Sequence, residues 1–135
     1  MNFGFDIPFV ELLGFELDHF EDGNATIRYA PAASHQNAFG MTHGGALMTL
    51  LDVVMASAAR SVNKESGMVT IEMKTSFMQT ARGRLTARGR LMHRSTSMAF
   101  TEGTVYDETG QACAHATGTF KYTRHRLTDS PPGTP

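Results

Sequence analysis

The sequence predicts an α+β fold in which a curved antiparallel β-sheet wraps around one long central α-helix. Three features predict it: a hairpin near the N-terminus, one helix that is apolar on almost every side, and four long strand-like runs after that helix. A helix that is apolar nearly all round must be covered on most sides, and a single sheet does this only by curling. The 135 residues fit one domain, which we place at residues 1–126.

The elements before the central helix are expected to be short. Residues 8–13 are predicted to form a short helix, since a proline is tolerated where a helix begins. Residues 15–19 and 25–30 are predicted to be two strands of a hairpin. The Asp-Gly-Asn sequence within the connecting residues 21–24 tolerates positive φ angles, which favours a tight turn. Residues 31–42 are expected to form an irregular loop.

The central helix is expected to begin at Thr42, to run for about twenty residues, and to end near residues 63–67, where Gly67 is a plausible stop. The apolar residues on one of its sides follow the i, i+3, i+4 spacing, and they are Leu47, Leu50, Leu51, Val54, Met55 and Ala58. Further apolar residues on the other side predict that the helix is buried.

Everything after the helix is predicted to be strand. The four runs are residues 68–79, 83–94, 97–106 and 111–124. In the run 83–94 apolar residues alternate with arginines, which indicates a strand with one buried and one exposed face. The sequence Asp-Glu-Thr-Gly at 107–110 predicts a hairpin turn. Long strands with an exposed edge also favour pairing between two copies of the chain.

Composition excludes several classes of function. The formal net charge of −1 argues against non-specific binding to nucleic acid or to an anionic membrane. No basic region followed by an apolar stretch marks a signal peptide, and the apolar run at 46–59 is too short to span a bilayer. We therefore expect a soluble, cytoplasmic protein. Residues 127–135, with three prolines, are predicted to be a disordered tail.

The thiol and imidazole content predicts neither a disulfide nor a metal centre. The single cysteine, Cys113, cannot form an internal disulfide, and a buried strand position is favoured over a nucleophilic role even though His115 lies two residues on. The six histidines show no recurring ligand spacing, so we expect no metal site. No cofactor is expected either.

The first unusual feature is the pair of glycines in His43-Gly44-Gly45, at the start of the central helix. Each glycine lowers helix propensity by about 1 kcal/mol relative to alanine. Both also leave bare the backbone N–H groups of the first turn, which have no partner within the helix. Such donors suit a developing negative oxygen. Close packing of the helix beneath the sheet explains the glycines equally well.

Asp52 is the second unusual feature, because it lies in the middle of the apolar helix. A carboxylate is costly to bury unless it is paired or hydrogen-bonded. It is either a structural aspartate bonded to a nearby hydroxyl or N–H group, or a general base or nucleophile in a dry pocket. We favour the functional interpretation.

The pattern Asn37, five residues, His43-Gly44-Gly45, six residues, Asp52 resembles the signature of hotdog-fold acyl-CoA thioesterases of the PaaI type, from phenylacetate degradation. Residues 69–78 resemble the strand that follows the helix in that family, and residues 93–100 resemble a turn between two later strands. The likeness covers roughly residues 10–124. It implies a hotdog fold and hydrolysis of an acyl-CoA, with CoA as part of the substrate.

The resemblance also implies roles for individual residues. The N–H of Gly44 would bind the thioester carbonyl, and Asp52 would attack it directly or through water. Asn37 would orient the water or the carbonyl, and His43 would shape the loop and contact the thioester. Thr70 stands where the family carries a small hydroxyl residue that assists the water.

Helix geometry predicts that these residues act across two subunits. Gly44 and Asp52 are eight residues apart, or about 12 Å along one helix axis, whereas a nucleophile must approach to about 3–3.5 Å. Two antiparallel helices related by a two-fold axis would bring Gly44 of one chain beside Asp52 of the other. We therefore expect a homodimer with two shared active sites, with a homotetramer as an open possibility.

Substrate contacts are expected beyond the attacking groups. CoA phosphates need cations, and arginines are frequent after the helix. The expected substrate-binding residues are Gly45, Arg60, Arg90, Arg94 and Ser95. An acyl pocket could be lined by methionine and phenylalanine side chains, although core packing is their commoner fate. The candidates are Met48, Met55, Met73, Met78, Met92, Phe77 and Phe100.

Two alternatives to hydrolysis remain open. A hotdog hydratase or dehydratase acting on acyl thioesters would use His43 as its base, paired with Asp52 of the partner. A non-catalytic acyl-CoA binding module would keep the pocket without the reaction. The spacing from Asn37 to His43 favours the thioesterase.

Overall fold

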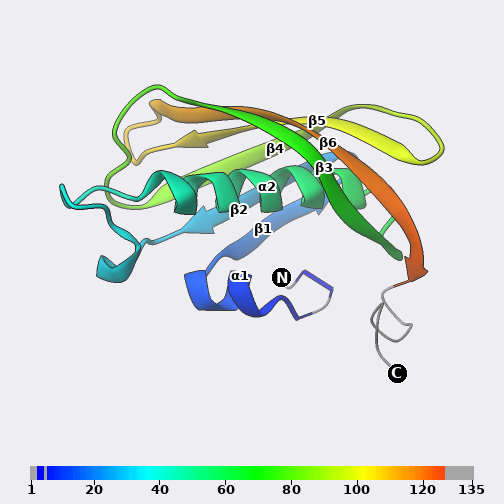
Figure 1. Cartoon of the computed structure of the whole chain (residues 1–135), viewed down its shortest axis with the longest axis horizontal. Helices are drawn as coiled ribbons and strands as arrows, with labels where there is room; N and C mark the ends of the chain where they lie inside the picture. The colour runs from blue at the N-terminus through cyan, green and yellow to red at the C-terminus, as the bar shows by residue number, and fades with distance from the viewer. Residues whose placement is uncertain (1–2, 5, 127–135) are drawn as a thin grey trace.

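The computed structural model describes residues 3–4 and 6–126, and its elements follow the predicted order (Figure 1). In chain order they are α1 Pro8–Leu13, β1 Glu16–Glu21, β2 Asn24–Tyr29, the 3₁₀ turn Ala33–His35, α2 Gly44–Arg60, β3 Ser66–Phe77, β4 Leu85–Arg94, β5 Met98–Tyr106 and β6 Ala112–Arg126. The short helix, the hairpin, the central helix and the four long strands are confirmed. The predicted disordered tail, residues 127–135, lies outside the described residues.

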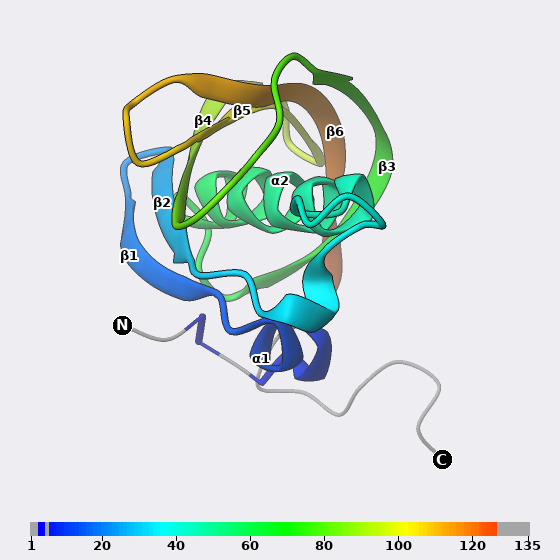
Figure 2. The same ribbon diagram turned by 90° about the vertical axis from the view of Figure 1, so that its left-hand side faces the viewer.

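The strands form one antiparallel sheet in the order β1-β2-β4-β5-β6-β3. Figure 2 shows this sheet curling around α2, with β1 and β3 at its two edges and α1 near the open side between them. The predicted curved sheet around a central helix is therefore confirmed. The register places β3 beside β6 alone, so one long edge of β3 has no neighbouring strand among the described residues.

The core lies between α2 and the concave face of the sheet, and β4 shows how the pattern produces it. Leu85 and Ala87 are buried against the helix while Arg88 is exposed, as the alternation predicts. At Gly89 the strand approaches so closely that a Cβ atom would lie 2.4 Å from the carbonyl oxygen of Val54. Only glycine fits there, because no real Cβ atom makes so short a contact with a backbone oxygen.

The central helix is shorter at both ends than predicted. It begins at Gly44 because the N–H of Thr42 bonds to the carbonyl of Ala81, outside the helix, and His43 caps the first turn. It ends at Arg60, where the hydroxyl of Ser61 donates to the carbonyl of Ala58 at 2.7 Å. Residues 61–65 form the turn between α2 and β3, and Gly67, the predicted stop of the helix, lies inside β3.

Cys113 is wholly buried in β6, and burial raises the pKa of its thiol. This confirms the interpretation of the residue as apolar filler. Among the described residues, no helix combines the length and the hydropathy needed to cross a membrane.

Candidate active site

The start of α2 presents one unused backbone donor. His43 is the N-cap, and its Nδ1 accepts the N–H of Gly45 at 2.8 Å. The N–H of Ala46 donates to the carbonyl of His43 at 3.0 Å. For the N–H of Gly44, the first residue of the helix, no acceptor is found among the described residues. This donor lies at the positive end of the helix dipole, so it suits an incoming negative oxygen.

The loop before the helix is held by Asn37. Its Oδ1 accepts the N–H groups of Phe39 at 2.9 Å and Met41 at 3.1 Å, and its own N–H donates to the carbonyl of Met41. The carbonyl oxygen of the side chain is therefore occupied in shaping the turn. Only the Nδ2 amide of Asn37 is left to contact a water or a carbonyl. In the role that the resemblance implies, Asn37 would therefore act as a hydrogen-bond donor.

Asp52 and Thr70 meet between α2 and β3. Thr70 donates from Oγ1 to Oδ1 of Asp52 at 2.7 Å. Burial raises the pKa of Asp52 above its ordinary value, and the hydrogen bond from Thr70 partly opposes this. The side chain is half-buried, so its carboxylate is desolvated and still reachable. A carboxylate in this state is a competent general base or nucleophile.

Gly44 and Asp52 lie on one stripe of α2 but far apart. The helix is unbroken from Gly44 to Arg60, so eight residues separate the two by about 12 Å along the axis. Met48 lies midway between them at the four-residue spacing, and it is 39% exposed although it belongs to the central helix. The stripe Gly44, Met48, Asp52 is thus the side of α2 that the sheet leaves partly open.

A cavity of about 230 Å³ lies beside Asp52. It runs between α2, the start of β3 and the N-terminal segment, and most of its surface is apolar. Its lining residues are Phe3, Ile7, Asp52, Val53, Ala56, Ser57, Arg60, Met68, Thr70 and Phe120. An apolar pocket with a carboxylate at one end is typical of a small-molecule site.

None of the side chains expected to form an acyl pocket lines this cavity. Met55 is wholly buried under β6, where a Cβ atom on Gly118 would lie 2.9 Å from its Cε. Sequence reasoning missed Phe3 and Ile7, because they precede the predicted elements and show no helical or strand spacing. The apolar character of the N-terminal residues was the one available signal.

Arg60 does not fit its predicted role as a phosphate contact. Its side chain is only 6% exposed, and Nη1 donates to the carbonyl of Phe3 at 2.7 Å. The guanidinium also lies 4.9 Å from the ring centre of Phe20, and burial lowers its pKa. Arg60 therefore holds the N-terminal segment against the end of α2.

The other predicted phosphate contacts are not brought to Asp52 within one chain. Arg90 lies on the convex face of β4 and pairs with Glu102 at 3.3 Å. Arg94 lies over the ring of Tyr122 at 4.8 Å, and Ser95 Oγ accepts the N–H of Met98 in the following turn. Tyr122, whose ring lies beneath Arg94, lines a cavity of about 770 Å³ together with Asn63, Ser66, Val69, Thr96, Ser97, Lys121 and Thr123.

Comparison with known proteins identifies the fold and its family. The model of the thioesterase superfamily matches residues 39–114, which include the whole of α2 and the five residues before it. The conserved protein PA5202 of Pseudomonas aeruginosa is 30% identical, with a TM-score of 0.84 over 89% of this chain and 97% of that one.

Two further solved structures are similar. A phenylacetic acid degradation-related protein of Ralstonia eutropha is 25% identical, with a TM-score of 0.79 over 86% of this chain and 91% of that one. The PaaI protein of the phenylacetic acid degradation operon of E. coli is 19% identical, with a TM-score of 0.83 over 90% and 88%. At that identity the E. coli protein supports the fold alone.

Proposed function

Because this chain belongs to the thioesterase superfamily and has its hotdog fold, we propose that it hydrolyses an acyl-CoA to a carboxylic acid and free CoA. The observation that carries the proposal is the desolvated carboxylate of Asp52 in the lining of an apolar cavity. An acyl group fits such a cavity, and a carboxylate in its lining is placed to activate the attack on a thioester.

The reaction needs a base or nucleophile and an oxyanion donor. The carboxylate of Asp52 attacks the thioester carbon, or takes a proton from a water that does so. Negative charge then develops on the carbonyl oxygen, which the N–H of Gly44 would bind. Collapse of the tetrahedral intermediate breaks the C–S bond and releases the CoA thiolate. In the direct route, water then hydrolyses the anhydride formed on Asp52.

We propose that each site combines Asp52 of one subunit with Gly44 of the partner subunit. The separation of about 12 Å along one helix supports this, since one thioester carbonyl cannot reach both groups of the same chain. Two antiparallel α2 helices would place Met48 at the two-fold axis, where its exposed side chain would be covered. The paired arrangement then forms two equivalent sites.

The edge strand β3 supports the same dimer. Within the described part of the chain β6 is the only strand that pairs with β3, and β3 exposes the large apolar side chains Val69, Ile71 and Phe77. Unpaired edges with apolar side chains favour pairing with another chain. Phe77 also contacts the start of α2, since a Cβ atom on Gly44 would lie 3.4 Å from its ring. Edge pairing along β3 would therefore bring the two α2 helices together.

The capping role of His43 favours hydrolysis over the hydratase alternative. Its Nδ1 accepts the N–H of Gly45, so a neutral ring carries its proton on Nε2. Neither nitrogen then has a lone pair free to act as a base. Asp52 remains the group suited to proton removal.

We propose that CoA approaches along the cavity beside Arg94, where Lys121 also supplies a positive charge. Thr70 and Val69 are neighbours in β3, so this cavity and the Asp52 side lie on opposite faces of the same edge strand. Because that edge is the proposed dimer contact, a substrate would pass around the end of β3, with its phosphates on one face and its acyl group on the other.

The proposal is tested by following free thiol release from a panel of acyl-CoAs, with wild type, Asp52→Ala and Asp52→Asn. We expect turnover in wild type and its loss in both variants. Turnover that survives both substitutions contradicts the assigned mechanism. Binding without thiol release from any substrate would favour a non-catalytic acyl-CoA binding module.

A further inference from the structure

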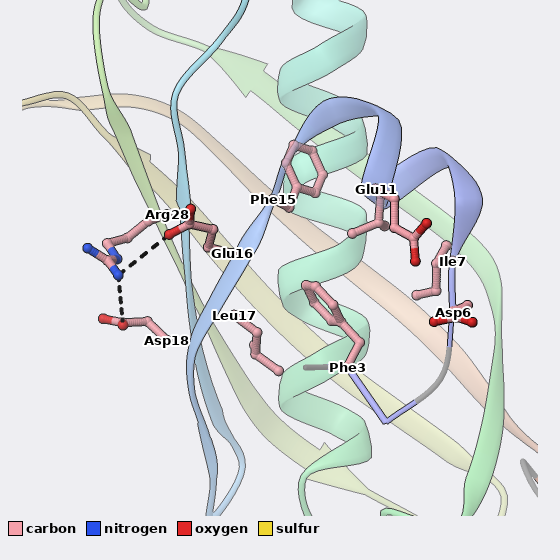
Figure 3. Close-up of a pocket in the computed structure, with 10 residues that line it drawn as sticks. Phe3, Asp6, Ile7, Glu11, Phe15, Glu16, Leu17, Asp18 and Arg28 are labelled. Carbon is pink, nitrogen blue, oxygen red and sulfur yellow. Dashed lines mark ion pairs between the residues drawn. The ribbon is translucent and has the colours of Figure 1, made fainter. Parts of the chain in front are cut away.

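Two cavities meet at the N-terminal segment. The first, of about 230 Å³, opens beside Asp52. The second, of about 340 Å³, lies between this segment, α1 and β1, and Figure 3 shows its lining residues. Phe3 and Ile7 are the two residues that line both cavities. Their side chains therefore form a partition between the two spaces, which we call the N-terminal wall.

The wall is anchored on both sides. The guanidinium of Arg60 donates to the carbonyl of Phe3 at 2.7 Å. Gly4 packs so closely on this guanidinium that a Cβ atom there would lie 2.8 Å from Nη2. On the other side, α1 begins directly after Ile7 and buries Val10 in the core. The partition is thus held by the end of α2 and by α1 together.

The second cavity has an apolar floor and an acidic rim. Val10, Phe15 and Leu17 are buried at its base. Four carboxylates are among its lining residues, and Figure 3 shows those of Asp6 and Glu11 near Ile7. Those of Glu16 and Asp18 turn toward Arg28, which pairs with them at 3.6 and 3.4 Å. The floor suits a hydrocarbon chain. The rim disfavours a carboxylate at the end of that chain.

We propose that Phe3 and Ile7 determine the length of the acyl group by closing the far end of the cavity beside Asp52. This inference rests on the proposed acyl-CoA hydrolysis. A dry cavity of about 150 Å³ holds benzene, so the 230 Å³ of this one accommodates an aryl ring with a short side chain or a medium-length chain. A longer chain meets the wall.

Removal of the wall would join the cavity to a second one that is larger than itself. Each additional methylene that is transferred from water to the apolar floor would raise kcat/KM by roughly fourfold. The wall thus selects against long chains, although the fold contains space for them immediately behind it.

The test measures kcat/KM over linear acyl-CoAs from acetyl to hexadecanoyl, with wild type, Phe3→Ala, Ile7→Ala and the double variant. We expect the preferred chain to lengthen by about two to four carbon atoms in each single variant, and further in the double variant. The matched control is Phe9→Ala, since Phe9 is in the same segment, is 53% exposed and lines neither cavity. Its length profile should equal that of wild type.

A second measurement separates this inference from the proposed reaction. Dissociation constants of S-alkyl-CoA thioethers, which cannot be hydrolysed, are measured by calorimetry against alkyl length. Affinity should stop rising at medium length in wild type and continue to rise in Ile7→Ala. Identical length profiles in these two proteins overturn the inference, whether or not the enzyme turns over acyl-CoA. Absence of turnover with altered binding profiles overturns the reaction and supports the wall.

A variant on the α2 side of the cavity tests the inference without altering the N-terminal segment, whose folding Phe3→Ala or Ile7→Ala could disturb. Ala56→Leu adds side-chain volume on the α2 side of the cavity and changes no residue of α1. It should shift both the kinetic and the binding profile to shorter chains. An unchanged profile would place the acyl group elsewhere and contradict the inference.

Discussion

Thr70 on the edge strand β3 and Asp52 in the middle of α2 are joined by a hydrogen bond of 2.7 Å from Oγ1 to Oδ1. This bond connects the proposed base to the strand on which we place the dimer contact. It also lowers the pKa of Asp52 against the larger opposing effect of burial. The reactivity of the carboxylate therefore depends on the position of β3.

Thr70→Val should move the acidic limb of the pH profile to higher pH. The substitution removes a hydrogen bond that favours the ionised carboxylate, so the pKa of Asp52 rises further. Asp52 acts when ionised, so activity in the variant falls at a higher pH than in wild type. The measurement is kcat/KM against pH.

Thr70→Ser is the matched control for this shift, because it keeps the hydroxyl group and removes only a methyl. Its acidic limb should coincide with that of wild type. A shift of equal size in both variants would show that packing, rather than the hydrogen bond, sets the pKa.

Asp52→Asn should be more stable than wild type at neutral pH. Burial raises the folded-state pKa of Asp52 above its unfolded value, so its contribution to stability is fully present below the unfolded pKa. That contribution is lost as pH rises through the folded pKa. Asparagine has no such dependence and can still accept a hydrogen bond from Thr70. The difference in Tm, measured by calorimetry, should therefore grow with pH over this range, and a constant or shrinking difference would contradict it.

Gly89→Ala should destabilise the fold by about 1–3 kcal/mol or more. A Cβ atom there would lie 2.4 Å from the carbonyl oxygen of Val54, so the sheet must move away from α2. Urea unfolding measures the change. The control is Arg88→Ala at the neighbouring exposed position, which should change stability by no more than about 0.5 kcal/mol. Equal effects at the two positions would contradict the close approach of strand and helix.

Much of the fold could be predicted because local patterns act directly on the elements. The alternation at Leu85 and Ala87 sets the concave face of β4, and Asp22-Gly23 sets the first hairpin. The end of α2 could not be predicted in the same way. It depends on the hydrogen bond from the hydroxyl of Ser61 to the carbonyl of Ala58, and on the start of strand β3 at Ser66.

The proposed site was predictable where it depends on spacing along α2, as for Gly44 and Asp52. It was not predictable where it depends on contacts between distant segments. Arg60 looks like a free cation in the sequence, yet its guanidinium donates to the carbonyl oxygens of Phe3 in the N-terminal segment and of Lys64 after α2. For the same reason, the position of Phe3 and Ile7 in the cavity beside Asp52 could be found only from the structure.

Gly44→Pro should lower kcat by roughly 10²–10³-fold with little loss of stability. Proline is favoured at the first position of a helix. His43, which precedes it, already has the extended φ of −62° and ψ of 138° that proline requires. The substitution therefore removes the N–H donor and preserves the helix. Gly44→Ala keeps the donor and should retain most activity in the same steady-state assay. Equal kcat values for the two variants would show that the N–H of Gly44 takes no part in catalysis.

The most direct test of the shared active site combines two inactive chains. Gly44→Pro and Asp52→Asn are co-expressed with different affinity tags, and the heterodimer is purified through both. One of its sites carries both substitutions and the other carries neither. Thiol release should recover to about half of the wild-type rate per dimer. A heterodimer no more active than its parents, or an active monomer, would contradict a site built from Asp52 of one chain and Gly44 of the partner subunit.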